Sequence, residues 1–140
     1  MCMSNLNTLG IDIGSTTVKI AILDGNNHIL FADYQRHFAN IQETLAQLLK
    51  KARESLGAMD VIPAITGSGG LTLSKHLDVP FIQEVVAVAG ALQDYAPQTD
   101  VAIELGGEDA KIIYFTGGID QRMNGICAGG TGSFIDQMAC

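Results

Sequence analysis

The sequence predicts an α/β fold with a mixed sheet, in which three antiparallel N-terminal strands come first and helices flank the sheet. Three observations predict it. Three apolar runs separated by turn residues fill the first 36 positions. An amphipathic run with helical period follows them at 41–56. Beyond it, short apolar runs alternate with helical segments, and this alternation is typical of an α/β domain.

The N-terminal strands are expected at about 7–13, 17–24 and 28–36. The first two are apolar runs rich in isoleucine, leucine and valine, residues that favour strands. The segment Asp24-Gly25-Asn26-Asn27 between the second and third strands contains the residue types that tight hairpin turns require. We therefore expect a meander of three antiparallel strands.

The first helix is expected from Asn40 to Gly57. Asn40 followed by Glu43 resembles a capping box, and Gly57 is a suitable C-terminal stop. The residues between them keep one apolar face at helical spacing: Ile41, Leu45, Leu48, Leu49, Ala52 and Leu56.

The rest of the chain alternates short strands and helices. Strands are expected at 61–66, 101–105 and 110–115, helices at about 70–77, 84–95 and from 131, and turns at 67–70 and 117–118. Three meandering strands, a helix, and then strands separated by helices form the order of a ribonuclease-H-like half.

Length and composition limit the classes of protein that fit. A chain of 140 residues is expected to form a single domain, and 47% hydrophobic residues provide a substantial core. The net charge of −7, without a basic stripe, argues against nucleic-acid binding. No apolar run approaches twenty residues and no targeting segment is visible, so we expect no membrane association and a cytoplasmic location. Three irregularly spaced cysteines are not a disulfide framework and are expected to be reduced.

The most informative segment is Gly10–Lys19, where one apolar run ends in Asp12, turns, and returns as a second apolar run. This pattern predicts a β-hairpin whose tip can wrap phosphate oxygens while Asp12 holds a hydrated divalent metal ion. An ordinary hairpin with a polar turn is the alternative. The candidate phosphate-binding residues are Gly14, Ser15, Thr16, Thr17 and Lys19, and Lys19 is equally compatible with a solvated surface cation.

A second copy of the pattern lies about ninety residues further on, at Ala102–Ile113. An apolar strand carries Glu104, turns at Gly106 and Gly107, and continues as another apolar strand. Each turn leads into a strand and not a helix, so neither copy is a P-loop or a dinucleotide fingerprint. We expect the two hairpins to face one ligand.

This pair of hairpins resembles the ATPase domains of the actin, sugar-kinase and heat-shock-chaperone superfamily, in which they are phosphate loops. Within it, the run Asn124-Gly-Ile-Cys127-Ala-Gly-Gly-Thr131-Gly132-Ser-Phe134 is similar to the signature of activators of 2-hydroxyacyl-CoA dehydratases, which are grouped with benzoyl-CoA reductase ATPase subunits. The segment Thr66-Gly67-Ser68-Gly69 and the helix start at Glu84 also match that family.

The resemblance implies cofactors and partners. Activators of this family are homodimers that hold one [4Fe-4S] cluster between subunits. They use ATP hydrolysis to drive single electrons from a ferredoxin or flavodoxin into a dehydratase or reductase component. Cys127 would be a cluster ligand, although a lone cysteine is more often a small buried hydrophobe. The family's second cluster cysteine does not occur in these 140 residues.

The resemblance also implies roles at the ATP site. Asp12 would bind Mg²⁺ through water, and Glu104, where the family has aspartate, would orient the attacking water or reach the metal. Gly106 and Gly107 would allow close approach of phosphate. From the cysteine segment, Thr131 and Gly132 would contact the nucleotide. Glu108 stands where the family usually has glutamine.

The resemblance covers nearly the whole sequence but only the first half of such a domain. We therefore expect residues 1–140 to be the N-terminal half of an actin-like ATPase domain, truncated, and inactive alone. The alternatives are a sugar or N-acetylhexosamine kinase and a non-catalytic actin-like scaffold. No histidine metal site is expected, because the three histidines are isolated: His28, His37 and His76.

Overall fold

The computed structural model describes residues 6–107 and 109–123. The chain divides into two compact units, Met1–Ile82 and Gln83–Cys140. The length alone leads to the expectation of a single domain, and the division falls just before the helix that starts at Glu84. The described strands accordingly form two separate sheets, one in each unit.

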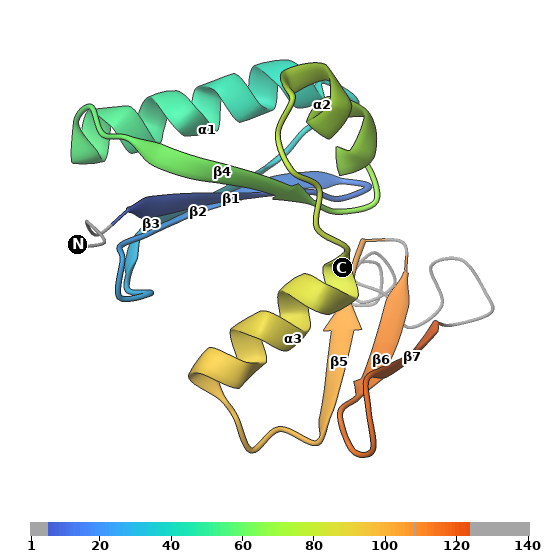
Figure 1. Cartoon of the computed structure of the whole chain (residues 1–140). Coiled ribbons are helices and arrows are strands. Elements are labelled where there is room, and N and C mark those ends of the chain that lie inside the picture. The colour runs from blue at the N-terminus through green and yellow to red at the C-terminus, as the bar shows by residue number, and fades with distance from the viewer. Residues whose placement is uncertain (1–5, 108, 124–140) are drawn as a thin grey trace, which may run out of the picture. The chain divides into compact units, whose positions relative to one another are not determined.

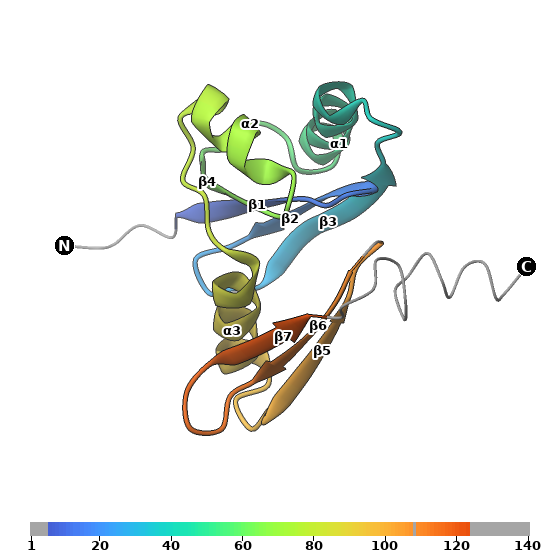
Figure 2. The same ribbon diagram turned by 90° about the vertical axis from the view of Figure 1, so that its right-hand side faces the viewer.

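The first unit contains a mixed sheet, as the sequence predicts (Figure 1). Its described strands lie in the order β3-β2-β1-β4, with β1 antiparallel to β2, β2 antiparallel to β3, and β1 parallel to β4. The bounds are β1 Asn7–Ile13, β2 Thr17–Leu23, β3 Ile29–Arg36 and β4 Val61–Thr66. Two helices, α1 Ile41–Leu56 and α2 Gly70–Leu77, lie on the same side of the sheet (Figure 2).

The core of this unit forms where α1 covers one face of the sheet. Alternate residues of a strand point to opposite faces, so Ile11 and Ile13 of β1 face the helix together with Val18 and Ile20 of β2. Leu48 of α1 is fully buried against them, which stabilises the unit by about 1.5–3 kcal/mol. The opposite face of β1, which carries Asp12, is thereby left for the site.

The segment 79–82 makes one isolated bridge, Ile65–Phe81, because Pro80 has no N–H to donate to a ladder. The start of α1 differs from the sequence interpretation. The Asn40 side chain does not cap α1; it donates instead to the Glu43 carboxylate. The Thr44 hydroxyl donates to the Asn40 carbonyl at 2.8 Å.

The second unit contains an antiparallel sheet in the order β5-β6-β7, preceded by α3 Glu84–Tyr95. Its strands are β5 Val101–Leu105, β6 Ala110–Tyr114 and β7 Asp120–Met123. The sequence interpretation has no strand at 120–123, because this segment is short and polar. The helix expected from 131 lies outside the described residues.

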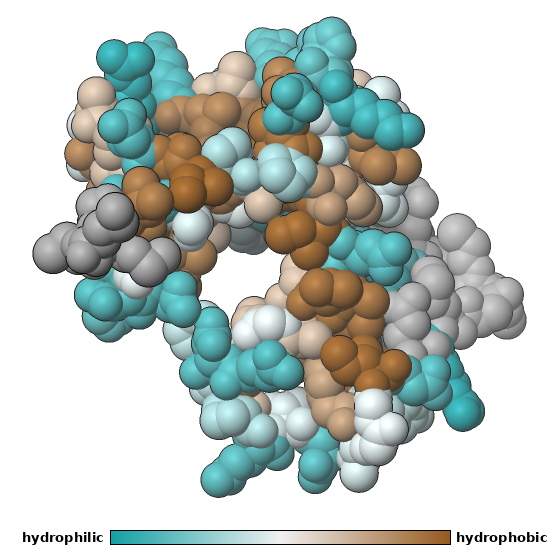
Figure 3. Space-filling view, in the orientation of Figure 1, coloured by the Kyte–Doolittle hydropathy of each residue, from teal (hydrophilic) through white to brown (hydrophobic). Residues whose placement is uncertain are grey.

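Hydrophobic side chains also reach the surface of both units (Figure 3). In β5 they are Val101, Ile103 and Leu105, on the strand face opposite Ala102 and Glu104. No helix within the described residues is long and apolar enough to cross a bilayer.

Candidate nucleotide-binding site

The first predicted hairpin is confirmed between β1 and β2. The Gly14 N–H donates to the Thr17 carbonyl at 2.9 Å and closes a tight turn, with Ser15 exposed at its tip. Thr16 and Thr17 are half-buried beside it. The chain therefore reverses within four residues and leaves short polar side chains and backbone at the tip.

Asp12 lies at the end of β1 in a cross-strand row of polar side chains. It is directly opposite Lys19 of β2 and opposite Thr66 of β4. Because Ile11 and Ile13 face the core, these three side chains share the face of the sheet away from α1. Lys19 Nζ lies 3.0 Å from Asp12 Oδ2, so Lys19 is a neighbour of the proposed metal ligand.

The loop after β4 packs closely on Asp12. Gly67 has a φ of +97°, and a Cβ at this position would lie 2.5 Å from Asp12 Oδ1 and 2.3 Å from the Ile13 carbonyl oxygen. The Gly69 N–H donates to the same Ile13 carbonyl at 2.9 Å. Glycine is therefore required at 67 for two reasons, the left-handed backbone and the close approach.

The chemistry of this corner fits a hydrated Mg²⁺ ion bound to nucleotide. Mg²⁺ prefers oxygen ligands and keeps several waters, with one or two carboxylates and substrate phosphates completing its shell. Asp12 supplies a carboxylate whose side chain is 34% exposed, and Thr66 Oγ1 is buried with no hydrogen-bond partner among the described residues. The described residues contain no group of three His, Cys, Asp or Glu side chains that could hold a metal ion.

His37 belongs to this site, although the sequence shows it only as an isolated histidine. It is buried, and its backbone N–H donates to the Thr16 carbonyl at 3.1 Å. Its ring Nε2 lies 3.0 Å from the Gly14 carbonyl oxygen. The contact joins positions 23 residues apart in the chain, which no local motif signals.

The second predicted hairpin is confirmed between β5 and β6. The Gly106 N–H donates to the Asp109 carbonyl at 2.8 Å, and a Cβ at Gly106 would lie 2.3 Å from Asp109 Oδ1. Gly107 is half-buried in the same turn. Glu104 is the second-last residue of β5 and lies directly opposite Lys111.

Lys111 is a buried cation that the sequence analysis leaves out. Its Nζ pairs with Glu84 of α3 and lies 3.3 Å from Asp109 Oδ2. Burial alone would lower the pKa of Lys111, but the hydrogen bond to Glu84 and the charges of Glu104, Glu84 and Asp109 raise it above its ordinary value. Lys111 therefore stays protonated and holds the carboxylates beside the second turn.

The two hairpins are each described within their own unit. The first unit brings together Asp12, Gly14, Ser15, Thr16, Thr17 and Lys19, and the second brings together Glu104, Gly106 and Gly107. Convergence of the two groups on one ligand stays a prediction. Cys127, Thr131 and Gly132 lie outside the described residues.

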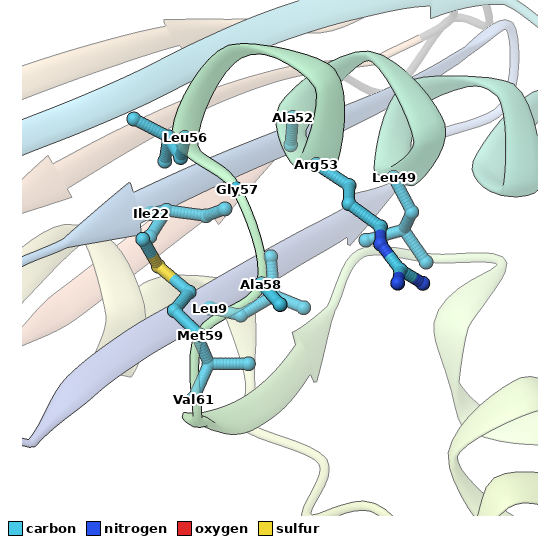
Figure 4. Close-up of a pocket in the computed structure, with 10 residues that line it drawn as sticks. All are labelled: Leu9, Ile22, Leu49, Ala52, Arg53, Leu56, Gly57, Ala58, Met59 and Val61. Carbon is cyan, nitrogen blue, oxygen red and sulfur yellow. The ribbon is translucent and has the colours of Figure 1, made fainter.

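A cavity of about 260 Å³ lies at the other end of the first sheet, where α1 meets the start of β4 (Figure 4). Leu9, Ile22 and Met59 line it, and Arg53 is its one charged lining residue. Leu9 is about 16 Å along the strand from the Gly14 turn, at roughly 3.3 Å per residue. This apolar cavity is distinct from the phosphate hairpin and does not suit a triphosphate.

A mixed sheet in the order β3-β2-β1-β4, with a carboxylate near the end of β1 and a tight polar turn after it, has the topology expected of a ribonuclease-H-like half, the fold of actin-like ATPase domains. Comparison with known proteins agrees with this class. The chain belongs to the BadF/BadG/BcrA/BcrD ATPase family, whose family model matches residues 9–140.

Three relatives illustrate the match. The chain is 33% identical over 136 residues to the activator of lactoyl-CoA dehydratase from Anaerotignum propionicum, covering 94% of this chain and 52% of that protein. The crystal structure of the Acidaminococcus fermentans (R)-2-hydroxyglutaryl-CoA dehydratase component A matches with a TM-score of 0.82 at 28% identity, over 96% of this chain and 53% of that chain. The activator of the 2-hydroxyisocaproyl-CoA dehydratase from Clostridium difficile with bound ADPNP matches with a TM-score of 0.80 at 28% identity, over 96% of this chain and 51% of that chain. The chain thus spans about half the length of the curated relatives it matches.

Proposed function

We propose that the full-length protein is an ATP-dependent activator of an enzyme of the 2-hydroxyacyl-CoA dehydratase type. Residues 1–140 would be the N-terminal half of its actin-like ATPase domain and would supply much of the ATP site. The observation that carries the proposal is the corner formed by Asp12, Thr66 and Gly67 at the first hairpin. The names of the relatives and the ADPNP bound to one of them support it.

Each hairpin residue has a role in this proposal. Ser15, Thr16 and Thr17 would bind terminal phosphate oxygens through hydroxyl and backbone N–H groups. Asp12 would accept hydrogen bonds from metal-bound water, while Lys19 offsets phosphate charge. Backbone at Gly14, Gly106 and Gly107 would approach the phosphates closely, because these residues lack a side chain.

Glu104 would orient the water that attacks the terminal phosphate. It lies directly opposite Lys111 in the β5–β6 ladder, two residues before Gly106, and a carboxylate there can accept a hydrogen bond from water. Thr131 and Gly132 would contact the nucleotide from the cysteine segment.

The electron-transfer part of the proposal rests on the segment around Cys127. Cys127 from each of two subunits would bind a shared [4Fe-4S] cluster, which supplies one-electron chemistry when bound. A ferredoxin or flavodoxin would be the donor, and a dehydratase or reductase component the acceptor. We place the protein in the cytoplasm, where thiols are kept reduced.

Anaerobic iron–sulfur reconstitution of the full-length protein tests this proposal. We expect a 4Fe absorption band that is lost in Cys127→Ser and kept in the matched controls Cys2→Ser and Cys140→Ser. The wild-type protein should also hydrolyse ATP. Retention of the band in Cys127→Ser would contradict the cluster assignment.

The two alternatives give different results in the same assays. An ATPase activity that hexosamine stimulates and Cys127→Ser leaves unchanged would identify a sugar kinase. A protein that binds neither nucleotide nor iron would be a scaffold.

A further inference from the structure

The buried residue His37 joins the segment after β3 to the tip of the phosphate hairpin. Its side chain and backbone make two contacts with the hairpin, ring Nε2 to the Gly14 carbonyl at 3.0 Å and backbone N–H to the Thr16 carbonyl at 3.1 Å. These two carbonyls flank Ser15, the exposed residue at the tip.

The hydrogen bonds assign the tautomer of the His37 ring. Nδ1 lies 3.0 Å from the backbone nitrogen of Ala39, and a backbone N–H can only donate, so Nδ1 is the acceptor. The proton of the neutral ring is then on Nε2, which donates to the Gly14 carbonyl. The ring therefore connects the hairpin with the turn at Ala39.

That turn is strained. Phe38 and Ala39 have φ values of +45° and +66°, a left-handed conformation that costs roughly 1–2 kcal/mol for a residue with a side chain. The Phe38 side chain is 84% exposed, so its burial does not offset this cost. The bonds across the turn hold it in place, Ala39 N–H to the His37 ring and Asn40 N–H to the His37 carbonyl at 2.7 Å.

The contact with Gly14 has a consequence for phosphate binding. In a planar trans peptide the C=O and the following N–H point in opposite directions. A Gly14 carbonyl held toward buried His37 therefore directs the Ser15 N–H to the opposite side of the peptide, away from the imidazole ring. Anions bind where successive backbone N–H groups point outward together, so this orientation matters for a phosphate loop.

We propose that His37 is a positioning residue that orients the Gly14–Ser15 peptide so that the Ser15 N–H meets the terminal phosphates of ATP. This inference rests on the proposed nucleotide site. It does not place His37 in contact with the nucleotide.

Two substitutions at His37 separate its two hydrogen bonds. In His37→Gln the side-chain amide nitrogen takes the place of Nε2 and can still donate to Gly14. In His37→Asn the amide oxygen takes the place of Nδ1 and can still accept from Ala39, but no donor reaches Gly14. His28→Gln is the control, because His28 lies in the exposed turn before β3.

Calorimetric binding of Mg-ADPNP and of adenosine to the full-length protein tests the proposal. We expect His37→Asn to bind Mg-ADPNP about tenfold more weakly than wild type, which is the effect of about one hydrogen bond. His37→Gln and His28→Gln should stay within about threefold of wild type, and adenosine, which has no phosphates, should bind all four proteins alike. Unchanged Mg-ADPNP binding by His37→Asn would overturn the proposal, as would a parallel loss of adenosine binding, because a merely structural role predicts the latter.

A measurement on the wild-type protein keeps the test valid if a variant does not fold. Long-range ¹⁵N–¹H correlation spectra of the His37 ring should show the proton on Nε2, and a proton on Nδ1 would overturn the proposal. Failure of the wild-type protein to bind Mg-ADPNP would instead disprove the proposed function, and the role of His37 would fall with it.

Discussion

Lys19 Nζ lies 3.0 Å from Asp12 Oδ2 across the β1–β2 ladder, so the carboxylate at the end of β1 already has a cationic partner. The two side chains are 51% and 34% exposed, and an exposed pair of this kind contributes about 0–1 kcal/mol. Either side chain of this pair can therefore be substituted without unfolding the sheet. Lys51 and Asp33 form a nearly identical pair, at 3.1 Å with 55% and 33% exposure, on the face that α1 covers. This second pair provides matched controls.

Asp12→Asn should remove the effect of Mg²⁺ on nucleotide binding. The amide is uncharged, so it no longer attracts a hydrated divalent cation. We expect wild-type protein to bind ADPNP at least tenfold more tightly with Mg²⁺ than with EDTA, and Asp12→Asn to show a ratio near one. Asp33→Asn should keep the wild-type ratio. An unchanged ratio in Asp12→Asn would show that the metal ion is bound elsewhere.

Lys19→Met should weaken Mg-ADPNP binding about tenfold, because the ammonium no longer offsets phosphate charge at the hairpin. The free energy of unfolding should change by less than about 1 kcal/mol, since the pair with Asp12 is exposed. Lys51→Met is the control and should bind the nucleotide normally. Tighter binding by Lys19→Met would mean that Lys19 only competes with the cation for Asp12.

Gly67→Ala should destabilise the protein and weaken Mg-ADPNP binding together. A Cβ at 67 would meet the Ile13 carbonyl at 2.3 Å and Asp12 Oδ1 at 2.5 Å, in addition to the strain of a φ of +97°. We expect a loss of more than about 2 kcal/mol in denaturant unfolding.

Gly57→Ala is the control for the strain alone. Its φ is +79° and a Cβ there meets nothing within 4 Å, so only the cost of backbone strain, about 1–3 kcal/mol, and normal nucleotide binding are expected. Equal effects at the two glycines would contradict the close packing of Gly67 against Asp12.

Lys111→Met should destabilise the protein by about 1.5–3 kcal/mol at pH 7.5, because it removes a buried ammonium and leaves the half-buried carboxylates of Glu84 and Asp109 without their cation. The pKa of Lys111 is raised in the folded protein, so its contribution is fully present below the ordinary pKa of 10.5 and is lost as the pH rises through the raised value. The difference between wild type and variant should therefore stay constant from pH 7.5 to about 9.5 and shrink above about 10.5. Urea unfolding across this range measures it, with the exposed Lys50→Met as control. A difference that shrinks already below pH 9 would contradict the raised pKa.

Most elements of the fold could be predicted from local sequence. The apolar runs around Ile11 and Ile20, the Asp24–Asn27 turn and the apolar face of α1 each specify their element without help from distant residues. The segment 79–82 is apolar, but Pro80 limits it to one bridge with β4. The strand β7 carries no apolar signal, and its pairing with β6 forms it.

The candidate site also contains parts that local sequence predicts and parts that it does not. The hairpins with Asp12 and Glu104 are visible as local motifs because each carboxylate, turn and strand are adjacent in sequence. The places of His37 and Lys111 in the site cannot be predicted from local sequence. His37 contacts Gly14, 23 residues away, and Lys111 pairs with Glu84, 27 residues away. Such contacts are properties of the folded chain.

A crystal structure of the full-length protein with Mg²⁺ and ADPNP tests most directly whether the two hairpins bind one nucleotide. We expect one nucleotide whose terminal phosphates contact both the Gly14–Thr17 turn and the Gly106–Gly107 turn, with Asp12 and Glu104 on either side of the metal-bound phosphate. A nucleotide that contacts only one hairpin, or that lies away from both, would contradict this expectation.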